Sequence, residues 1–125
     1  MIRNKIAAAF GAAVLAGLGI GATATPASAA ISDCDPGALC AWDDAWFQYT
    51  PGQVFGDNVD LHRFTKFNNA ESVWNNGNVC NVMVYNGLYH TGNVFTLSRG
   101  TGISVLDDYR GGIFADNLNS NKWCV

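Results

Sequence analysis

The most constraining feature of this chain is a seven-residue phrase that occurs twice. Residues 49–55 read YTPGQVF and residues 89–95 read YHTGNVF, so a tyrosine, two residues, a glycine, an amide, a valine and a phenylalanine return with a period of 40 residues. A second pattern, two Asn or Asp residues, two free positions and a serine, occurs at 68–72 and again at 116–120. Such self-similarity indicates that one supersecondary unit is used twice.

The first 29 residues have the three parts of a secretory signal peptide. Arg3 and Lys5 belong to a short basic start, residues 6–20 are apolar, and residues 27–29 read ASA, the small-x-small form that signal peptidase cuts. The apolar run is broken by glycines and is short for a helix that spans a bilayer. We therefore expect residues 1–29 to be removed and the rest to be secreted into the extracellular medium.

The predicted mature domain, residues 30–125, is small and acidic, with repeat one over about 38–76 and repeat two over about 79–125. It has five Lys or Arg against ten Asp or Glu, a net charge of −5. Five scattered cations make a poor surface for nucleic acid, and no basic amphipathic helix suits an anionic membrane. We expect a monomer that binds neither.

Four cysteines remain after the predicted cleavage: Cys34, Cys40, Cys80 and Cys124. An even count in a small exported chain indicates two disulfides. Of the three possible pairings the sequence favours Cys34–Cys40, across an Asp-Pro-Gly turn, and Cys80–Cys124, which spans repeat two. Loop closure predicts about 2.4 kcal/mol of stabilisation for the short bridge and about 4 kcal/mol for the long one. A zinc site is disfavoured because the spacings are not paired CxxC units.

The turn density is that of an all-β domain, because Gly, Asn and Asp interrupt every apolar run within about ten residues. The pattern predicts eight short strands, over residues 39–42, 53–55, 59–61, 71–74, 79–85, 94–98, 103–106 and 120–124. In the fifth strand Val82 and Val84 point to one face of the sheet. The alternating residues Asn81, Met83 and Tyr85 point to the other. Four strands used twice predict two four-stranded Greek-key motifs packed as a sandwich.

The repeated phrase itself predicts architecture. A hairpin that folds over its own sheet needs a glycine at a positive φ, so Gly52 and Gly92 are expected to be turn glycines. Tyr49 and Tyr89 are then the aromatic residues that cover the two bends.

The stretch before the phrase is three residues longer in repeat one, and it carries two acidic and two aromatic side chains: Asp43, Asp44, Trp46 and Phe47. A loop with two large rings could expose an apolar patch, so these four are candidate partner-binding residues. The alternative is that the rings fold back over the core.

The Asn/Asp-Ser pattern supplies hard oxygen ligands of the kind that Ca²⁺ requires. The candidate metal ligands are Asn68, Asn69, Ser72, Asp116, Asn117 and Ser120. The alternative is that these side chains pin loops by binding nearby backbone. No cofactor is required by the sequence, and calcium is the one metal it suggests.

The doubled Greek key, the aromatic-x-x-Gly corner and the Asn/Asp-Ser pattern resemble the βγ-crystallin fold. Three further stretches, CDPGALCAWDD at 34–44, FNN at 67–69 and SVWN at 72–75, are similar to a family of bacterial peptidase inhibitors whose founding member blocks secreted metalloproteinases. The resemblance covers the whole predicted mature chain. Two departures matter: the calcium motif of the fold ends in Ser-Ser or Thr-Ser, whereas Val73 and Asn121 stand here, and no short local disulfide marks an inhibitory loop in repeat two. Asp116 makes the second copy the better calcium candidate.

The resemblance implies a secreted proteinaceous inhibitor of an extracellular (metallo)peptidase that docks an exposed loop of a disulfide-locked β scaffold. The candidate loops are 43–48 and 75–78. The alternatives are a calcium-binding or structural crystallin-like module, or a secreted toxin or cell-wall-binding protein on the same fold. An enzyme is not expected, because the chain has two histidines, one glutamate and neither a GxSxG nor an HExxH motif.

Overall fold

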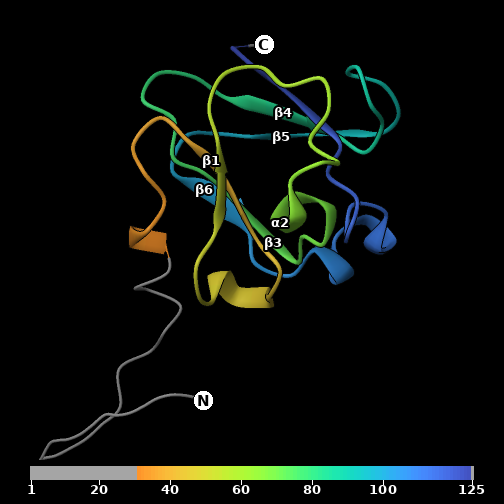
Figure 1. Cartoon of the computed structure of the whole chain (residues 1–125), viewed down its shortest axis with the longest axis horizontal. Helices are drawn as coiled ribbons and strands as arrows, with labels where there is room; N and C mark the ends of the chain where they lie inside the picture. Colours follow the sequence, from red (N-terminus) through yellow and green to blue (C-terminus); the bar gives the residue numbers. More distant parts are fainter. Residues whose placement is uncertain (1–30, 125) are drawn as a thin grey trace, which may run out of the picture.

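The computed structural model describes residues 31–124, so the predicted signal peptide lies outside the described residues. Between residues 39 and 123 the strands and the α-helix occur in the order β1 (Leu39–Trp42), β2 (Gly52–Val54), α2 (Thr65–Asn68), β3 (Ser72–Asn75), β4 (Val82–Tyr85), β5 (Val94–Leu97), β6 (Thr101–Ile103) and β7 (Ser120–Trp123). Three 3-10 turns, η1 (Ala45–Phe47), η2 (Leu106–Asp108) and η3 (Arg110–Gly112), lie at the end of the molecule opposite β4 (Figure 1). The expected mostly-β architecture is confirmed.

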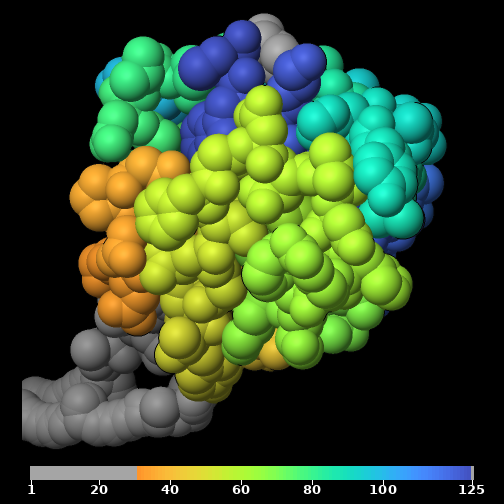
Figure 2. Space-filling view, turned by 45° about the horizontal axis from the view of Figure 1, so that its top comes forward, coloured from red at the N-terminus to blue at the C-terminus, as the bar shows by residue number. Residues whose placement is uncertain are grey.

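The strands form two antiparallel sheets that exchange a strand between the repeats. One sheet has the order β2-β1-β3-β6, and the other has the order β5-β4-β7. Thus β6 of repeat two completes the sheet of repeat one, while Asn58 of repeat one makes an isolated bridge to Asn121 in β7. The yellow-green segment around residue 58 lies against the dark blue C-terminal strand in Figure 2. This order is consistent with two interlocked Greek keys.

The third strand of each repeat starts earlier than the hydrophobic pattern predicts. A strand over 59–61 is wrong, because pairing there is a single bridge at Asn58, and the second occurs at 101–103 instead of 103–106. Leu61 is fully buried, and its N–H binds the carbonyl of Asn119 at 2.7 Å. The apolar runs therefore mark side chains that enter the core, not the residues whose backbones pair.

The helix α2 is absent from the sequence prediction. It is a single turn, too short to show a helical period, in which the N–H of Asn69 binds the carbonyl of Thr65. Its one fully buried side chain is Phe67, which fills the core between the sheets.

The core is built from both repeats and follows the predicted alternation. Val82 and Val84 are fully buried, while Met83 and Tyr85 are half-buried and Asn81 is exposed, as expected for a strand with one face inward. A smaller cluster around Trp42 packs beside the Cys34–Cys40 disulfide.

Both disulfides have the favoured pairing. Cys34 is bonded to Cys40, and Cys80 is bonded to Cys124. The first closes the turn that leads into β1. The second ties the segment before β4 to the end of β7, so it spans the whole of repeat two.

The opening hairpins of the two repeats have the same length. Ala41 pairs with Gly52 in the first, and Val84 pairs with Phe95 in the second, so equivalent residues are 43 positions apart. The two copies of the seven-residue phrase, 40 apart, are therefore three residues out of structural register. The three-residue insertion inferred from them is absent.

Backbone angles support the 43-residue register. Three pairs share a positive φ: Trp46 and Tyr89 (64° and 56°), Phe47 and His90 (56° and 61°), and Tyr49 and Gly92 (71° and 83°). Four of these residues, Tyr49, Tyr89, His90 and Gly92, were matched to the wrong partner by the sequence phrase. The fold does repeat, but equivalent residues of the two repeats are identified by strand pairing and backbone angles and not by the seven-residue phrase.

The two glycines of the phrase consequently have different roles. Gly92 is a turn glycine with φ 83°, as predicted, whereas Gly52 is the first residue of β2 and has no positive φ. A Cβ on Gly52 would lie 2.7 Å from the Cβ of Lys66, so close approach of α2 requires glycine there. Tyr49 and Tyr89, the residues predicted to cover the two bends, are 46% and 68% exposed.

Candidate functional site

The 43–49 loop is fixed to the start of β3 by one buried hydroxyl. Ser72 Oγ accepts the N–H of Phe47 at 3.1 Å and donates to the carbonyl of Asp44 at 2.8 Å. The N–H of Trp46 binds the carbonyl of Ser104 at 2.8 Å, which joins the loop to the segment after β6. Three hydrogen bonds therefore hold this loop against two different strands.

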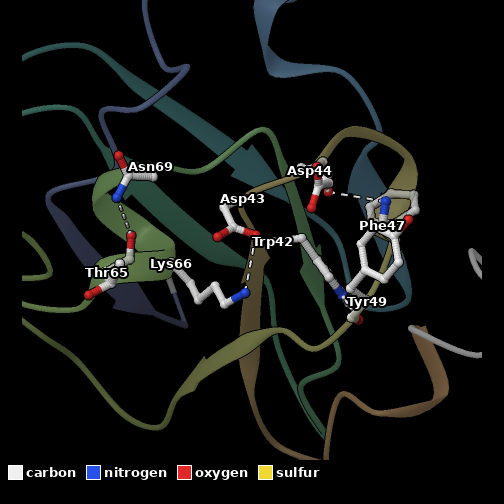
Figure 3. A network of polar contacts seen from close by, with 9 residues as sticks. Trp42, Asp43, Asp44, Phe47, Tyr49, Thr65, Lys66 and Asn69 are labelled. Atoms are coloured by element: carbon white, nitrogen blue, oxygen red, sulfur yellow. Dashed lines mark hydrogen bonds and ion pairs between the residues drawn. The ribbon is translucent and has the colours of Figure 1, made fainter.

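The two aromatic side chains of the loop point in opposite directions. Phe47 turns inward and makes edge contacts with Trp42 and Trp74, at centroid distances of 5.3 and 5.5 Å. The indole N–H of Trp42 closes the loop by binding the carbonyl of Tyr49 at 3.0 Å (Figure 3). Trp46 points outward and is 58% exposed. The fold-back alternative thus describes Phe47, while Trp46 is available to a partner.

A groove of about 490 Å³ lies beside Trp46. Its other walls come from β6, the residues after it and η2: Gly102, Ile103, Ser104, Val105, Asp108 and Tyr109. The groove is shallow and mainly apolar, and it has one carboxylate on its rim.

The acidic residues of the loop differ in pairing. Asp43 accepts an ion pair from Lys66 at 3.1 Å, as Figure 3 shows. Asp44 and Asp108 are exposed, and neither carboxylate has an ion pair within residues 31–124. Negative charge at this end of the molecule is therefore only partly balanced.

Glu71 lies beside two further carboxyl groups at this end of the molecule. Burial, together with the nearby carboxyls of Asp116 and Asp107, raises the pKa of Glu71 from its ordinary 4.5 to about 7. The N–H of Leu106 binds the carbonyl of Glu71 at 2.9 Å, so the backbone holds these groups together.

Repeat two has the same loop device. Ser120 Oγ accepts the N–H of His90 at 2.9 Å and donates to the carbonyl of Gly87 at 2.6 Å. The ring of His90 lies 5.4 Å from that of Tyr85, in the place that Phe47 takes beside Trp42.

The predicted calcium ligands therefore bind backbone in this arrangement. Besides the two serines, the side-chain amide of Asn69 donates to the carbonyl of Thr65 at 3.0 Å, and that of Asn117 donates to the carbonyl of Ile113 at 3.3 Å. Asn68 lies in α2, and Asp116 is exposed with φ 56°. In the described part of the chain, no three His, Cys, Asp or Glu side chains are grouped to hold a metal ion. Calcium binding stays a prediction.

A second exposed loop, residues 76–80, lies at the other end of β3. Val79 is 80% exposed, the largest fraction among the large apolar side chains described, and Cys80 beside it is held by the bridge to Cys124. The candidate segment 75–78 predicted from the sequence ends one residue short of Val79. Its exposure could not be read from a pattern, although its place beside a disulfide-bonded cysteine was a signal.

Hydrogen bonds fix the 76–80 loop from three directions. Asn76 donates its backbone N–H to the carbonyl of Ala38 at 2.9 Å and its side-chain amide to the carbonyl of Cys34 at 2.7 Å. The N–H of Gly77 binds Oδ1 of Asn75 at 2.7 Å. The guanidinium of Arg99 donates to the carbonyl of Asn78 at 2.8 Å. The loop thus presents an apolar tip on a fixed backbone.

The family of the chain can now be stated. A model of peptidase inhibitor family I36 matches residues 27–97, more than half of the sequence. The chain belongs to peptidase inhibitor family I36. Membership of this family points to a peptidase as the partner and to an inhibitor in place of an enzyme. A comparison with curated proteins gives no match.

Solved structures show the same fold as this family I36 chain at low identity. A structure on the evolution of the eye-lens βγ-crystallin domain fold aligns with TM-score 0.60 and 16% identity, over 72% of this chain and 87% of the other. IPSE/alpha-1 from Schistosoma mansoni eggs gives 0.56 and 18%, over 73% and 88%. A βγ-crystallin from Ciona intestinalis gives 0.54 and 17%, over 70% and 100%. At this level of identity, these similarities show a shared fold and nothing about function.

Proposed function

We propose that this chain is a secreted inhibitor of an extracellular peptidase and that it acts by docking the 76–80 loop into the substrate cleft, with Val79 leading. The observation that carries the proposal is an 80% exposed apolar side chain on a loop fixed by the Cys80–Cys124 disulfide and by hydrogen bonds. A loop that is already rigid loses little conformational entropy on binding. The likeness to inhibitors of secreted metalloproteinases favours a metallopeptidase target.

Secretion is supported by the two disulfides, which persist in oxidising compartments. No helix between residues 31 and 124 is long and apolar enough to cross a membrane.

The 43–49 loop is the weaker candidate for the cleft. Its exposed residue, Trp46, is 58% exposed against 80% for Val79, and it borders a groove of about 490 Å³, whereas the hollow beside Val79 measures about 270 Å³. The substrate cleft of a peptidase must receive a projecting segment, and Val79 is the more exposed of the two side chains.

Inhibition assays against a broad panel of metallo- and serine peptidases test the proposal. We expect the purified protein to inhibit at least one of them at submicromolar concentration. Val79→Asp should abolish that inhibition without unfolding the protein, because the side chain is already in solvent. Leu88→Asp is the matched control, since Leu88 is 40% exposed in the hairpin loop of repeat two.

Two negative results have different meanings. If no peptidase in the panel is inhibited, the inhibitor function is wrong. If inhibition occurs but Val79→Asp and Leu88→Asp behave alike, the function stands and the choice of loop is wrong.

A further inference from the structure

The groove beside Trp46 is spatially separate from the 76–80 loop. Ser72, at the start of β3, holds the loop that carries Trp46, and Asn75, at the end of the same strand, holds the loop that carries Val79. A peptidase bound at Val79 therefore leaves the groove at the opposite end of the strand open to another contact.

The groove is lined in part by an edge strand of the first sheet. β6 is the last strand of the order β2-β1-β3-β6, so one side of its backbone has no neighbouring strand. Gly102, Ile103 and Ser104 line the groove along this edge. An edge of this kind accepts an extended segment of another chain through main-chain hydrogen bonds, while side-chain pockets supply specificity.

Trp46 is a fixed aromatic wall of the groove. Its backbone N–H is bonded to the carbonyl of Ser104, and Phe47 and Asp44 are bonded to Ser72, so the backbone that carries the indole is held in place before any partner arrives. Tyr89 has the same backbone conformation in repeat two, with its N–H on the carbonyl of Val59 at 2.9 Å. The backbone shape thus belongs to the fold, and what distinguishes this end is a tryptophan beside a groove. Tryptophan is among the residues that contribute most to interface energy.

The charge around the groove is negative. Asp108 lies on its rim, and four more carboxyl groups occupy the same end of the molecule: Asp44, Glu71, Asp107 and Asp116. Of the nearby cations, Lys66 pairs with Asp43, while Arg110 donates to the neutral carbonyl of Val94 at 2.8 Å and keeps its positive charge, so carboxyl groups outnumber cations at this end. The guanidinium of Arg110 also lies over Tyr109, 5.2 Å from the ring centroid. The rim therefore favours positive charge in a partner.

We propose that the Trp46 groove is a docking site for an extended, positively charged segment of a partner protein. The segment lies along the free edge of β6 and places an apolar side chain against Trp46. A Lys or Arg beside that apolar residue meets Asp108. The site is independent of Val79, so the inhibitor can hold a second protein, or a second part of its target, at the end opposite the inhibitory loop.

A labelled probe peptide tests this proposal on the purified chain. The probe is a seven-residue peptide with the sequence Thr-Lys-Val-Arg-Val-Lys-Thr, blocked at both ends, and its counterpart carries Glu at the three basic positions. Fluorescence anisotropy should show binding of the basic peptide that weakens strongly between 50 and 500 mM salt, because rim charges are screened. The acidic peptide should not bind.

Matched variants localise the contact. Trp46→Gly removes the ring at a position where glycine adopts the required φ freely, and it should weaken binding by about tenfold or more. Tyr89→Gly is the equivalent change in repeat two and should have no effect. Asp108→Asn should weaken binding by about threefold, whereas Asp35→Asn, the same change of charge in the Cys34–Cys40 turn, should not. Peptidase inhibition should persist in Trp46→Gly.

Several results would overturn the proposal. Equal losses in Trp46→Gly and Tyr89→Gly, or in Asp108→Asn and Asp35→Asn, would reduce the binding to general attraction between opposite charges. Equal binding of the acidic peptide would do the same. Amide shift mapping on the unmodified protein gives an answer that does not depend on variants: shifts must centre on 101–105, and shifts at 76–80 in their place would show that the groove is not the site.

Discussion

The hydroxyl groups of Ser72 and Ser120 make the same pair of hydrogen bonds in the two halves of the molecule. Each accepts a backbone N–H, at 3.1 and 2.9 Å, and donates to a backbone carbonyl, at 2.8 and 2.6 Å. In both cases the partners belong to the hairpin loop that opens the same repeat. Both serines are fully buried, so water cannot replace these bonds.

Replacing either serine by alanine should therefore destabilise the protein by about 1–3 kcal/mol, the cost of leaving buried polar groups without partners. Urea denaturation measures this loss. Ser98→Ala, at an exposed position, is the control and should change little. Ser72→Ala should also weaken peptide binding at Trp46, while Ser120→Ala should not. A loss below about 0.5 kcal/mol for both would show that the two hydroxyls do not hold the loops.

Tyr49 and Gly92 occupy equivalent positions, with φ 71° and 83°, so substitutions at them should have unequal effects. Tyr49→Gly introduces glycine, which adopts a positive φ without strain, so the free energy of unfolding should stay within about 1 kcal/mol of the original value. Gly92→Ala should cost about 1–3 kcal/mol, because positive φ strains alanine and its Cβ would lie 2.5 Å from Oδ1 of Asn86. Thermal unfolding of the two variants side by side decides the point. Equal losses would contradict the 43-residue register.

The raised pKa of Glu71 predicts how stability depends on pH. Between about 4.5 and about 7 the folded protein keeps a proton on Glu71 that the unfolded chain has released. Its contribution to stability is therefore complete below pH 4.5 and is lost as the pH rises through 7. Glu71→Gln, which stays neutral, should flatten this fall in a series of denaturation curves. Asp35→Asn should leave the slope unchanged, and the same slope in Glu71→Gln would mean that other groups cause it.

Calcium remains to be tested, and Asp116 is where we expect it to matter. Calorimetry with millimolar Ca²⁺ should give a signal that is lost in Asp116→Asn, because a carboxylate is a far stronger ligand than the amides of the first copy. Asn68→Ala should leave the signal in place. If the unmodified protein gives no heat and no shift in melting temperature, the two Asn/Asp-Ser stretches serve only to fix loops.

Local patterns were enough to predict most of the strands and both disulfides. The alternation around Val82 and Val84 has the period of a strand, and it corresponds to burial on one face. The Asp-Pro-Gly turn between Cys34 and Cys40 brings those two cysteines together. These features depend on a few neighbouring residues, which is why they can be read directly.

The register of the repeat could not be predicted in the same way. The phrase at Tyr49 and the phrase at Tyr89 look alike, yet the backbone conformation makes Tyr49 equivalent to Gly92. The register is set by strand pairing and by Ser72 and Ser120, whose partners lie 25 to 33 residues away. A short stretch of similar sequence does not reveal hydrogen bonds to residues that far away along the chain.

The functional surfaces were predicted only in part. Asp43, Asp44, Trp46 and Phe47 were grouped because they are neighbours in sequence, but Phe47 faces the core and Asp43 is paired. The groove beside Trp46 is completed by β6, which lies more than 50 residues later in the chain. The exposure of a side chain and the shape of a groove arise from packing between distant segments, so neither could be predicted from a local sequence pattern.

The exchange of strands between the repeats has a consequence for how the chain is made. The first sheet lacks its edge until residues 101–103 are available, and Asn58 has no bridge until Asn121 arrives. A chain still emerging from the ribosome therefore cannot finish its first half before its second. The first half is therefore completed only once residue 121 has been made, so the two halves fold as one unit.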